Sequence, residues 1–221
     1  MRKKTPVSGE AGRAEKIYDA LKVLYPRAET ALNFSNSWQM LASTILSAQC
    51  TDERVNRVTG PLFSKHPEAE DYANMDQRYL EKQIKSCGFY RNKAKNIIGA
   101  AGLITEKYGG EVPRTMEDML NLPGVARKTA NVVLGNAFGV VEGIAVDTHV
   151  KRLSGRLGLT EEKDPVKIEK DLMSIFPEDK WFNLTYLLIE HGRAVCKAPA
   201  PFCLKCRIRD LCPRKGVKKS R

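Results

Sequence analysis

The sequence predicts an all-α protein. Along most of its 221 residues, apolar side chains recur three and four positions apart, the spacing that gathers them on one face of a helix. Prolines, glycines and capping residues separate these amphipathic segments. Residues 141–146 are apolar enough for a strand, but no neighbouring segment could pair with them. We therefore expect helices packed against helices and no sheet.

Boundary signals place the individual helices. Pro26 stops the first helix, Ser35 or Asn36 caps the second, and Gly88 ends a later one. The last helix is expected to end at Gly192. The expected helices cover residues 14–24, 38–46, 52–63 (after Thr51), 79–87, 94–104, 126–138, 148–157, 165–176 and 181–191, with a short one after Thr115.

Lys128 is a candidate nucleophile at the start of one helix. The turn Leu122-Pro123-Gly124-Val125 leads into this helix, and Lys128 points away from its apolar side. In the first turn of a helix the dipole opposes a cation, which favours the neutral amine that attacks carbon. A plain surface lysine is the simpler alternative. The apolar stripe is expected to comprise Ala126, Ala130, Val133, Leu134, Ala137 and Phe138.

Asp147 lies between an apolar run and the next helical segment. This position suits an N-cap, and capping alone is the simpler interpretation of the carboxylate. The charge of the chain and its C-terminal cysteines, considered together with Lys128, favour a second role in catalysis.

The charge balance indicates a polyanionic partner. Lys and Arg outnumber Asp and Glu by 37 to 26, a formal net charge of +11, which favours nucleic acid over membrane. Arg2, Lys3 and Lys4 open a basic tail that suits phosphates or a solvated terminus. We find no long apolar run and no signal peptide, so a cytoplasmic protein is expected.

Four cysteines near the C-terminus predict a metal centre. Cys196, Cys203, Cys206 and Cys212 follow the pattern Cys-x6-Cys-x2-Cys-x5-Cys. Four thiolates in one short segment suit zinc or an iron–sulfur cluster, and the chemistry alone leaves both open. Basic residues such as Lys205 surround them, so the centre is expected to support a basic surface.

Two residues at helix junctions are candidates for contact with nucleic acid. Gln49 lies at a corner between two expected helices, where its amide can face outward. The alternative is an ordinary surface residue without a specific function. Phe89 follows a helix stop and precedes a basic run, which suits a wedge in DNA, or equally a loop packed on the core. Cys50 and Cys87 are expected to be buried as small hydrophobes.

Together these features resemble the endonuclease III family, bifunctional DNA glycosylases of the helix-hairpin-helix superfamily. The resemblance runs from about Ala14 to Cys212 and is carried by Leu46-Ser47-Ala48-Gln49, by residues 122–133, by Val146-Asp147-Thr148-His149 and by the cysteine spacing. It implies two helical domains with a DNA cleft between them. Residues 30–140 would form a six-helix barrel with a helix-hairpin-helix motif, and residues 1–29 with 141–221 a domain with a [4Fe-4S] cluster.

The resemblance also implies an activity. The expected monomeric, nucleoid-associated enzyme of base excision repair acts on double-stranded DNA with damaged pyrimidines or abasic sites. Lys128 would form a Schiff base, release oxidised pyrimidines and cut 3′ to the abasic site by β-elimination, with Asp147 as the catalytic carboxylate. The four cysteines would bind the cluster. The expected DNA contacts are Gln49, Phe89, Leu122, Gly124, Ala126, Arg127 and Lys205.

Two positions depart from the family pattern. Ala126 replaces the second glycine of the hairpin, and a methyl group is tolerated there only if φ stays negative. The loop from Cys196 to Cys203 lacks a basic residue near its middle, so Lys205 could replace that contact with phosphate.

Two other functions remain open from the sequence. An adenine-mismatch glycosylase of the same superfamily shares the hairpin and cluster, but lacks a lysine at the position of Lys128 and has an additional C-terminal domain. A non-catalytic DNA-binding protein with a metal centre would need neither Lys128 nor Asp147. The two residues therefore favour the bifunctional enzyme.

Overall fold

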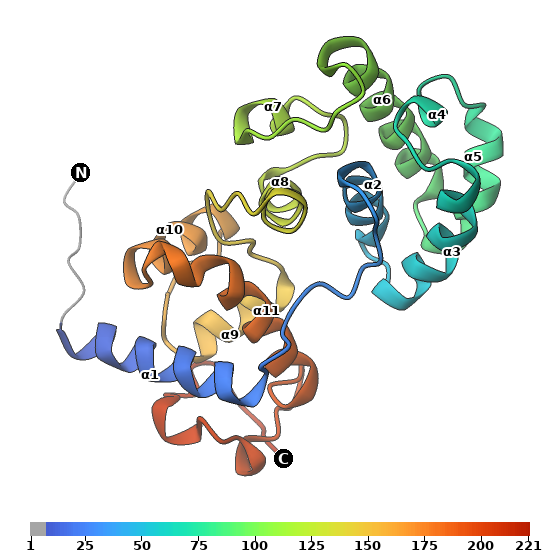
Figure 1. Ribbon diagram of the computed structural model, residues 1–221. Helices are drawn as coiled ribbons and strands as arrows, with labels where there is room; N and C mark the ends of the chain where they lie inside the picture. The colour runs from blue at the N-terminus through green and yellow to red at the C-terminus, as the bar shows by residue number, and fades with distance from the viewer. Residues whose placement is uncertain (1–7) are drawn as a thin grey trace. The chain divides into compact units, whose positions relative to one another are not determined.

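The computed structural model describes residues 8–221, without the side chains of Ser8 and Glu10. The basic residues Arg2, Lys3 and Lys4 lie outside this range. Every regular element between residues 8 and 221 is helical and none is a strand, which confirms the predicted all-α class (Figure 1). None of the helices in this range combines the length and the apolar character needed to cross a membrane.

The helices follow the expected order, with a few differences. The helix expected over 79–87 becomes a short 3₁₀ helix over its last three residues, and two short 3₁₀ helices after residue 202 were not predicted. A four-residue helix, α4, was not predicted because it is too short to show a periodic pattern. The helix expected over 126–138 is divided into an α-helical and a π-helical part, η2. The α-helices are α1 (Ser8–Leu24), α2 (Ser37–Ser47), α3 (Asp52–Lys65), α4 (Glu70–Ala73), α5 (Gln77–Ile84), α6 (Tyr90–Tyr108), α7 (Met116–Leu120), α8 (Arg127–Val133), α9 (Thr148–Arg156), α10 (Pro165–Ile175) and α11 (Glu178–Ala194). The short elements are η1 (Lys85–Cys87), η2 (Leu134–Phe138), η3 (Cys203–Lys205) and η4 (Arg209–Leu211).

The chain forms two compact units. The hairpin unit is Thr30–Glu142, and the cysteine unit is the described part of Met1–Glu29 together with Gly143–Arg221. Each unit has its own apolar core. Neither core needs a sheet, because each helix buries one apolar face against other helices.

The hairpin unit contains α2 to α8 and η2. Its core is built around large, fully buried side chains such as Trp38, Leu80 and Ile97. Of the two residues expected to cap α2, Asn36 does so, since its Oδ1 accepts a hydrogen bond from Gln39 N at 2.9 Å. Polar caps of this kind satisfy N–H groups that a helix start leaves unpaired.

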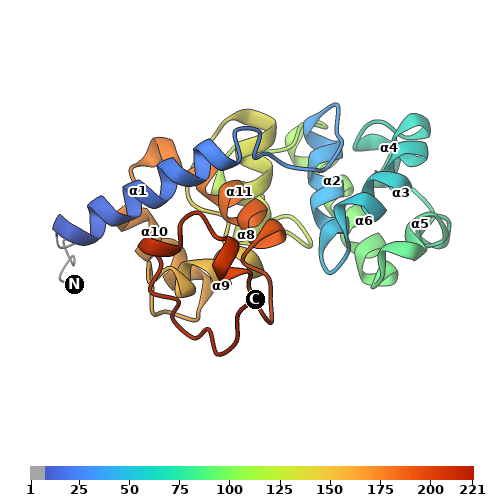
Figure 2. The ribbon, with the colours of Figure 1, turned by 90° about the horizontal axis from the view of Figure 1, so that it is seen from below.

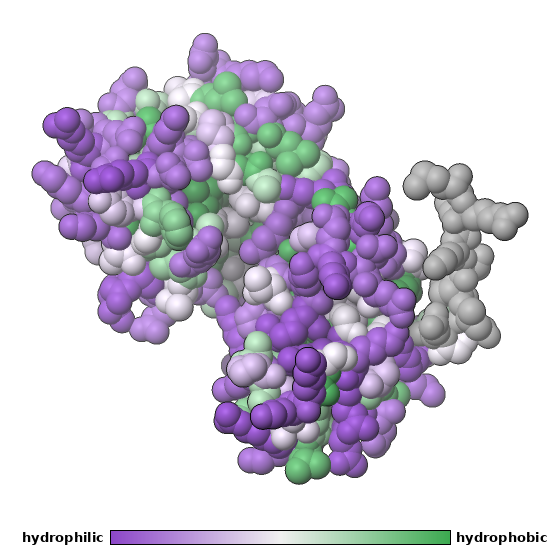
Figure 3. Space-filling model, turned by 180° about the vertical axis from the view of Figure 1, so that it is seen from behind, coloured by the Kyte–Doolittle hydropathy of each residue, from purple (hydrophilic) through white to green (hydrophobic). Residues whose placement is uncertain are grey.

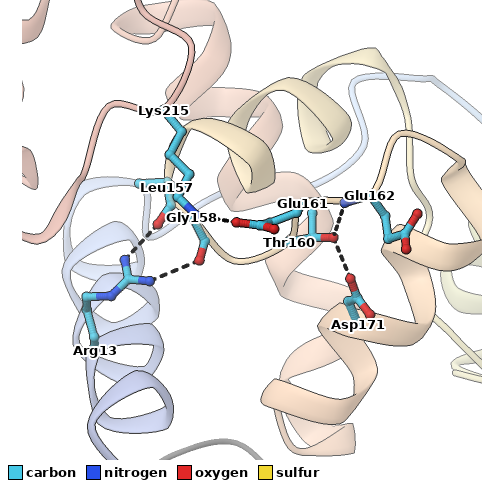
Figure 4. A network of polar contacts seen from close by, with 8 residues as sticks. All are labelled: Arg13, Leu157, Gly158, Thr160, Glu161, Glu162, Asp171 and Lys215. Atoms are coloured by element: carbon cyan, nitrogen blue, oxygen red, sulfur yellow. Dashed lines mark hydrogen bonds and ion pairs between the residues drawn. The ribbon is translucent and has the colours of Figure 1, made fainter. Parts of the chain in front are cut away.

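The cysteine unit joins the two ends of the chain. Figures 1 and 2 both show α1 beside the C-terminal segment. Arg13 connects them, because its guanidinium donates to the carbonyl oxygens of Leu157 (2.7 Å), Gly158 (3.1 Å) and Leu211 (3.1 Å). The first two of these contacts are drawn in Figure 4. A single side chain thus fixes α1 to the end of α9 and to η4.

The apolar segment before α9 is buried without forming a strand. Ile144 and Val146 belong to the core of the cysteine unit. The carbonyl oxygen of Ala145 between them accepts a hydrogen bond from Thr185 Oγ1 of α11 at 3.3 Å. The apolar run therefore reflects burial between helices, as its isolation in the sequence suggested.

Polar contacts fasten the loop that follows α9 (Figure 4). Thr160 Oγ1 donates to Asp171 Oδ2 at 2.5 Å and accepts from Glu162 N at 3.0 Å. Lys215 Nζ forms an ion pair with Glu161 Oε1 at 2.9 Å, which links the C-terminal segment to the same loop. Such exposed ion pairs contribute at most about 1 kcal/mol each.

Gly192 does not end the last helix, contrary to the prediction. Helix α11 continues to Ala194, and Gly192 is buried against α9. A Cβ at this position would lie 2.6 Å from His149 Nδ1 and 2.9 Å from Arg152 Nη2. The glycine is needed for close approach of two helices, a reason that its sequence neighbours do not reveal.

Candidate functional site

The turn between α7 and α8 is a tight hairpin that requires glycine at one position. Leu122 N donates to Met119 O and Val125 N to Leu122 O, each at 3.1 Å. Gly124 has φ +78°, and a Cβ there would lie 2.8 Å from Asn96 Cβ. Leu122 is buried and its N–H and C=O are paired, so it supports the hairpin from the core side.

Ala126 satisfies the condition that its methyl group imposes. It caps α8 with φ −99° and ψ 169°, an ordinary extended conformation for alanine. The side chain is exposed, so Ala126 lies outside the apolar stripe in which it was expected. The stripe begins instead at Ala130, which is fully buried together with Val133 and Leu134.

Lys128 is exposed in the first turn of α8, as predicted. It follows Arg127 and lies on the side of the helix away from the buried Ala130 and Val133. Backbone N–H groups of a first turn point outward along the helix axis and attract anions such as phosphate. The amine therefore lies where DNA backbone could bind next to it.

Asp147 caps α9 and is half-buried. Its Oδ1 accepts a hydrogen bond from Val150 N at 2.8 Å, so the predicted capping role is confirmed. Burial lowers the pKa of the neighbouring His149; the charge of Asp147 opposes this shift and that of Arg152 adds to it. Asp147 belongs to the cysteine unit and Lys128 to the hairpin unit, and their cooperation stays a prediction.

Gln49 and Phe89 both have left-handed backbone conformations. Gln49 (φ 54°) lies in the turn between α2 and α3, and Phe89 (φ 46°) immediately precedes α6. Both side chains are exposed, Phe89 by 63%, so the alternative of a Phe89 packed on the core is wrong. Within residues 8–221, Arg214 is the only other non-glycine residue with positive φ. Such conformations cost of order 1–3 kcal/mol and concentrate at functional sites.

The same two loops bring together a pair of thiols that the sequence did not connect. Cys87 is buried as predicted, but Cys50 is only half-buried, and its thiol lies close enough to affect the pKa of Cys87. Burial, reinforced by Cys50, raises the pKa of the Cys87 thiol to about 11. The loop of Gln49 and the loop of Phe89 are therefore neighbours beneath the surface.

The four C-terminal cysteines line one small apolar cavity of about 30 Å³ in the cysteine unit. Arg156 Nη1 donates to Cys196 Sγ and Arg214 N to Cys212 Sγ, both at 3.4 Å. Burial raises the pKa of Cys206 and of Cys212, and the other thiols of the set raise both further. Thiolates that share one cavity repel each other, and a bound cation would remove that cost.

The thiols that line this cavity are the donor set of both metal centres that the spacing left open. In the described part of the chain no group of three or more His, Cys, Asp or Glu side chains is arranged to hold a single metal ion.

His191 is a buried histidine with a structural role in the cysteine unit. It is buried beside the cavity, with Tyr25 Oη 3.0 Å from Nδ1 and Cys206 Sγ 3.5 Å from Nε2. Burial lowers the pKa of His191 to about 4, so the ring is neutral near pH 7.

Exposed cations surround the cysteine segment. Lys205 lies at the end of η3 with its side chain in solvent, and Lys197, Arg207 and Arg209 are exposed as well. Hydrophilic residues cover most of the face seen in Figure 3. The exposed cations agree with the polyanionic partner inferred from the net charge.

The fold and the hairpin define the class of protein. Residues 42–178 match the family model described as HhH-GPD superfamily base excision DNA repair protein. The endonuclease III of Synechocystis sp. is 55% identical over 201 residues, which cover 91% of this chain and 92% of the relative. The endonuclease III of Bacillus subtilis is 48% identical over 208 residues, 94% of each chain.

A solved structure agrees with these relatives. The trapped endonuclease III–DNA covalent intermediate superposes with a TM-score of 0.88 at 42% identity, over 92% of this chain and 96% of the other. The chain therefore belongs to the endonuclease III family, whose members are DNA N-glycosylases and AP lyases of base excision repair.

Proposed function

We propose that this chain removes oxidised pyrimidines from double-stranded DNA with Lys128 as the nucleophile. The observation that carries the proposal is the exposed amine in the first turn of α8, directly after the hairpin. A 42% identical endonuclease III has been captured as a covalent intermediate with DNA, which supports a covalent route here.

The proposed reaction has two stages. The neutral Lys128 amine attacks C1′ of the sugar, the bond from C1′ to the base breaks, and the base leaves with the proton that Asp147 has taken from Lys128. The bond from C1′ to O4′ then opens as O4′ takes up a proton from water, and C1′ and the amine nitrogen form a protonated Schiff base. The resulting Schiff base acidifies the C2′ proton; its removal breaks the bond from C3′ to oxygen and cuts the strand on the 3′ side. Asp147 would accept the proton that Lys128 loses and stabilise positive charge on the sugar.

The remaining site residues would bind and distort the duplex. Backbone N–H groups from Gly124 to Lys128 would meet a phosphate, with Ala126 and Arg127 on the same surface and the buried Leu122 as support. A damaged pyrimidine pairs and stacks poorly and is cheaper to extrude. Gln49 and Phe89 would fill the space that it vacates, and Lys205 would add a phosphate contact near the cysteines.

The cofactor would be a [4Fe-4S] cluster bound by Cys196, Cys203, Cys206 and Cys212. When bound, it would fix the loops between the cysteines and so hold the surrounding cations in place for DNA. The apolar cavity and the four thiols support this assignment. We assign it a structural role, because nothing in the proposed reaction transfers electrons.

The two units correspond in this proposal to two domains, the helical barrel over about residues 30–140 and the cluster domain formed by 1–29 and 141–221. DNA would contact both domains. We further propose that the protein acts as a monomer in the cytoplasm, associated with the nucleoid, where its net charge of +11 favours DNA.

Borohydride trapping tests the nucleophile. Duplexes with thymine glycol, uracil or an abasic site are incubated with the wild type, Lys128→Ala and Lys128→Arg. We expect incision and a borohydride-trapped adduct on the thymine-glycol and abasic duplexes with the wild type only. Lys128→Arg keeps the positive charge and should still bind DNA. Trapping that persists in Lys128→Ala would assign the chemistry to another residue, and a wild type that binds without incision would be a DNA-binding protein.

Metal analysis tests the cofactor. We expect brown protein with about four iron and four sulfide per chain, and loss of both in Cys206→Ser. Cys50→Ser is the matched control, since it removes a thiol outside the set of four and should keep the iron. Colourless protein that releases zinc would overturn the assignment.

A further inference from the structure

Lys93 is a charged side chain that is buried although its sequence context predicts exposure. It follows Phe89, Tyr90 and Arg91 in a basic run, yet only 4% of it is exposed. Its Nζ donates to Leu46 O and to Cys87 O, both at 2.8 Å. Burial lowers the pKa of Lys93, and the adjacent thiols of Cys50 and Cys87 oppose that shift.

Both acceptors lie at helix ends. Leu46 is in the last turn of α2, and Cys87 is the last residue of η1. Carbonyl groups at a helix end lack intrahelical partners and lie at the negative end of the dipole. A cation that donates to both therefore stabilises both ends and links them to α6, which carries it.

Each of these ends leads directly into a strained, exposed residue. Gln49 comes three residues after Leu46, and Phe89 comes two residues after Cys87. Their left-handed conformations persist only if contacts with the surrounding structure hold them in place. Lys93 supplies such a constraint to both loops, and the hydrogen bonds from its Nζ to Leu46 O and Cys87 O show that the loops are neighbours.

We propose that Lys93 is a positioning residue, which fixes the spacing between Gln49 and Phe89 so that both can enter the base stack together. This inference rests on the proposed function of those two residues in filling the gap left by the extruded base. Lys93 would not touch DNA. Its effect reaches the reaction through the two loops that it joins.

Loss of Lys93 should affect base excision and abasic-site incision differently. Excision of a paired base requires both residues to replace it in the stack, whereas a preformed abasic site has no base to expel. Displacing a positioned group by about 1 Å can slow a reaction roughly a hundredfold. We therefore expect Lys93→Met to slow single-turnover excision of thymine glycol by about ten- to a hundredfold and to change abasic-site incision far less.

Three variants separate positioning from other effects. Lys93→Met removes the donors at nearly constant length, and Lys93→Arg restores donors and should recover most of the excision rate. Lys95→Met removes an exposed cation from the same helix and controls for the loss of charge. Should Lys93→Met fail to fold by circular dichroism, Lys93→Gln takes its place in every assay, because its shorter side chain cannot donate to both carbonyl groups at once.

Two measurements decide the outcome. The first is the fluorescence of 2-aminopurine placed opposite a non-cleavable abasic analogue, which rises when inserted side chains unstack it; Lys93→Met should reduce this signal at saturating protein. The second is a mutant cycle based on the excision rate. The double variant Gln49→Ala, Phe89→Ala should already be slow, and adding Lys93→Met should lower its excision rate little further.

Any one of three results would overturn the positioning role. Lys93→Met could lose excision and abasic incision equally, its effect could be additive in the mutant cycle, or it could behave like Lys95→Met. A wild type that neither excises nor forms a trapped adduct would instead refute the proposed function itself, so the two failures are distinguishable.

Discussion

Replacement of Asp147 separates its structural role from its catalytic one. The carboxylate caps α9 through one hydrogen bond of 2.8 Å from Val150 N, and the proposed reaction uses the same side chain as a proton acceptor. Asparagine and serine cap helices about as well as aspartate, whereas alanine does not. Neither asparagine nor serine can accept a proton at neutral pH.

The expected magnitudes follow from these two roles. Asp147→Ala loses the cap bond and the favourable charge at the helix N-terminus, together about 1–2 kcal/mol. Asp147→Asn keeps the bond and loses only the charge, about 0.3–1 kcal/mol. For a chain of this size each kcal/mol lowers Tm by about 2–4 °C. Both variants should lose roughly a hundred- to ten-thousandfold in single-turnover excision.

Thermal unfolding and single-turnover excision are measured on the same preparations. Stability should fall in the order wild type, Asp147→Asn, Asp147→Ala, whereas activity should fall equally in both variants. Excision by Asp147→Asn within about threefold of the wild type would leave only the cap and refute the catalytic role. Equal stability of the two variants would show instead that the cap bond contributes little.

Three further substitutions test packing that the structure shows. Gly124→Ala should lower the free energy of unfolding by about 2 kcal/mol, because positive φ and the contact with Asn96 both oppose a side chain; unchanged urea unfolding would contradict this. Gly192→Ala gains about 1 kcal/mol of helix propensity but should be destabilised overall by overpacking of about 1–3 kcal/mol; a raised Tm would mean that α9 adjusts. Arg13→Met should cost roughly 2 kcal/mol by leaving three carbonyl groups without a donor, and Arg13→Lys should recover only part of it in the same urea titration.

The features that depend on a few consecutive residues could be predicted from the sequence. The helices, the cap at Asn36 and the turn at Gly124 follow from the local preferences of apolar periodicity, polar side chains and glycine. The orientation of Lys128 away from the core follows from the helical repeat in the same way. The four cysteines were recognisable as candidate ligands because they lie in one short segment.

Other features depend on neighbours that are distant in the sequence. Lys93 is buried because two helix ends converge on it, and Gly192 stays inside a helix because α9 passes close by. Cys50 and Cys87 lie close together although nothing in their local sequences connects them. The sequence alone therefore determined the helical class, the hairpin and the set of candidate ligands, which are encoded by local chemistry. Only the tertiary structure decided which polar groups are buried and which loops are joined, because burial and contact are set by packing between elements far apart along the chain.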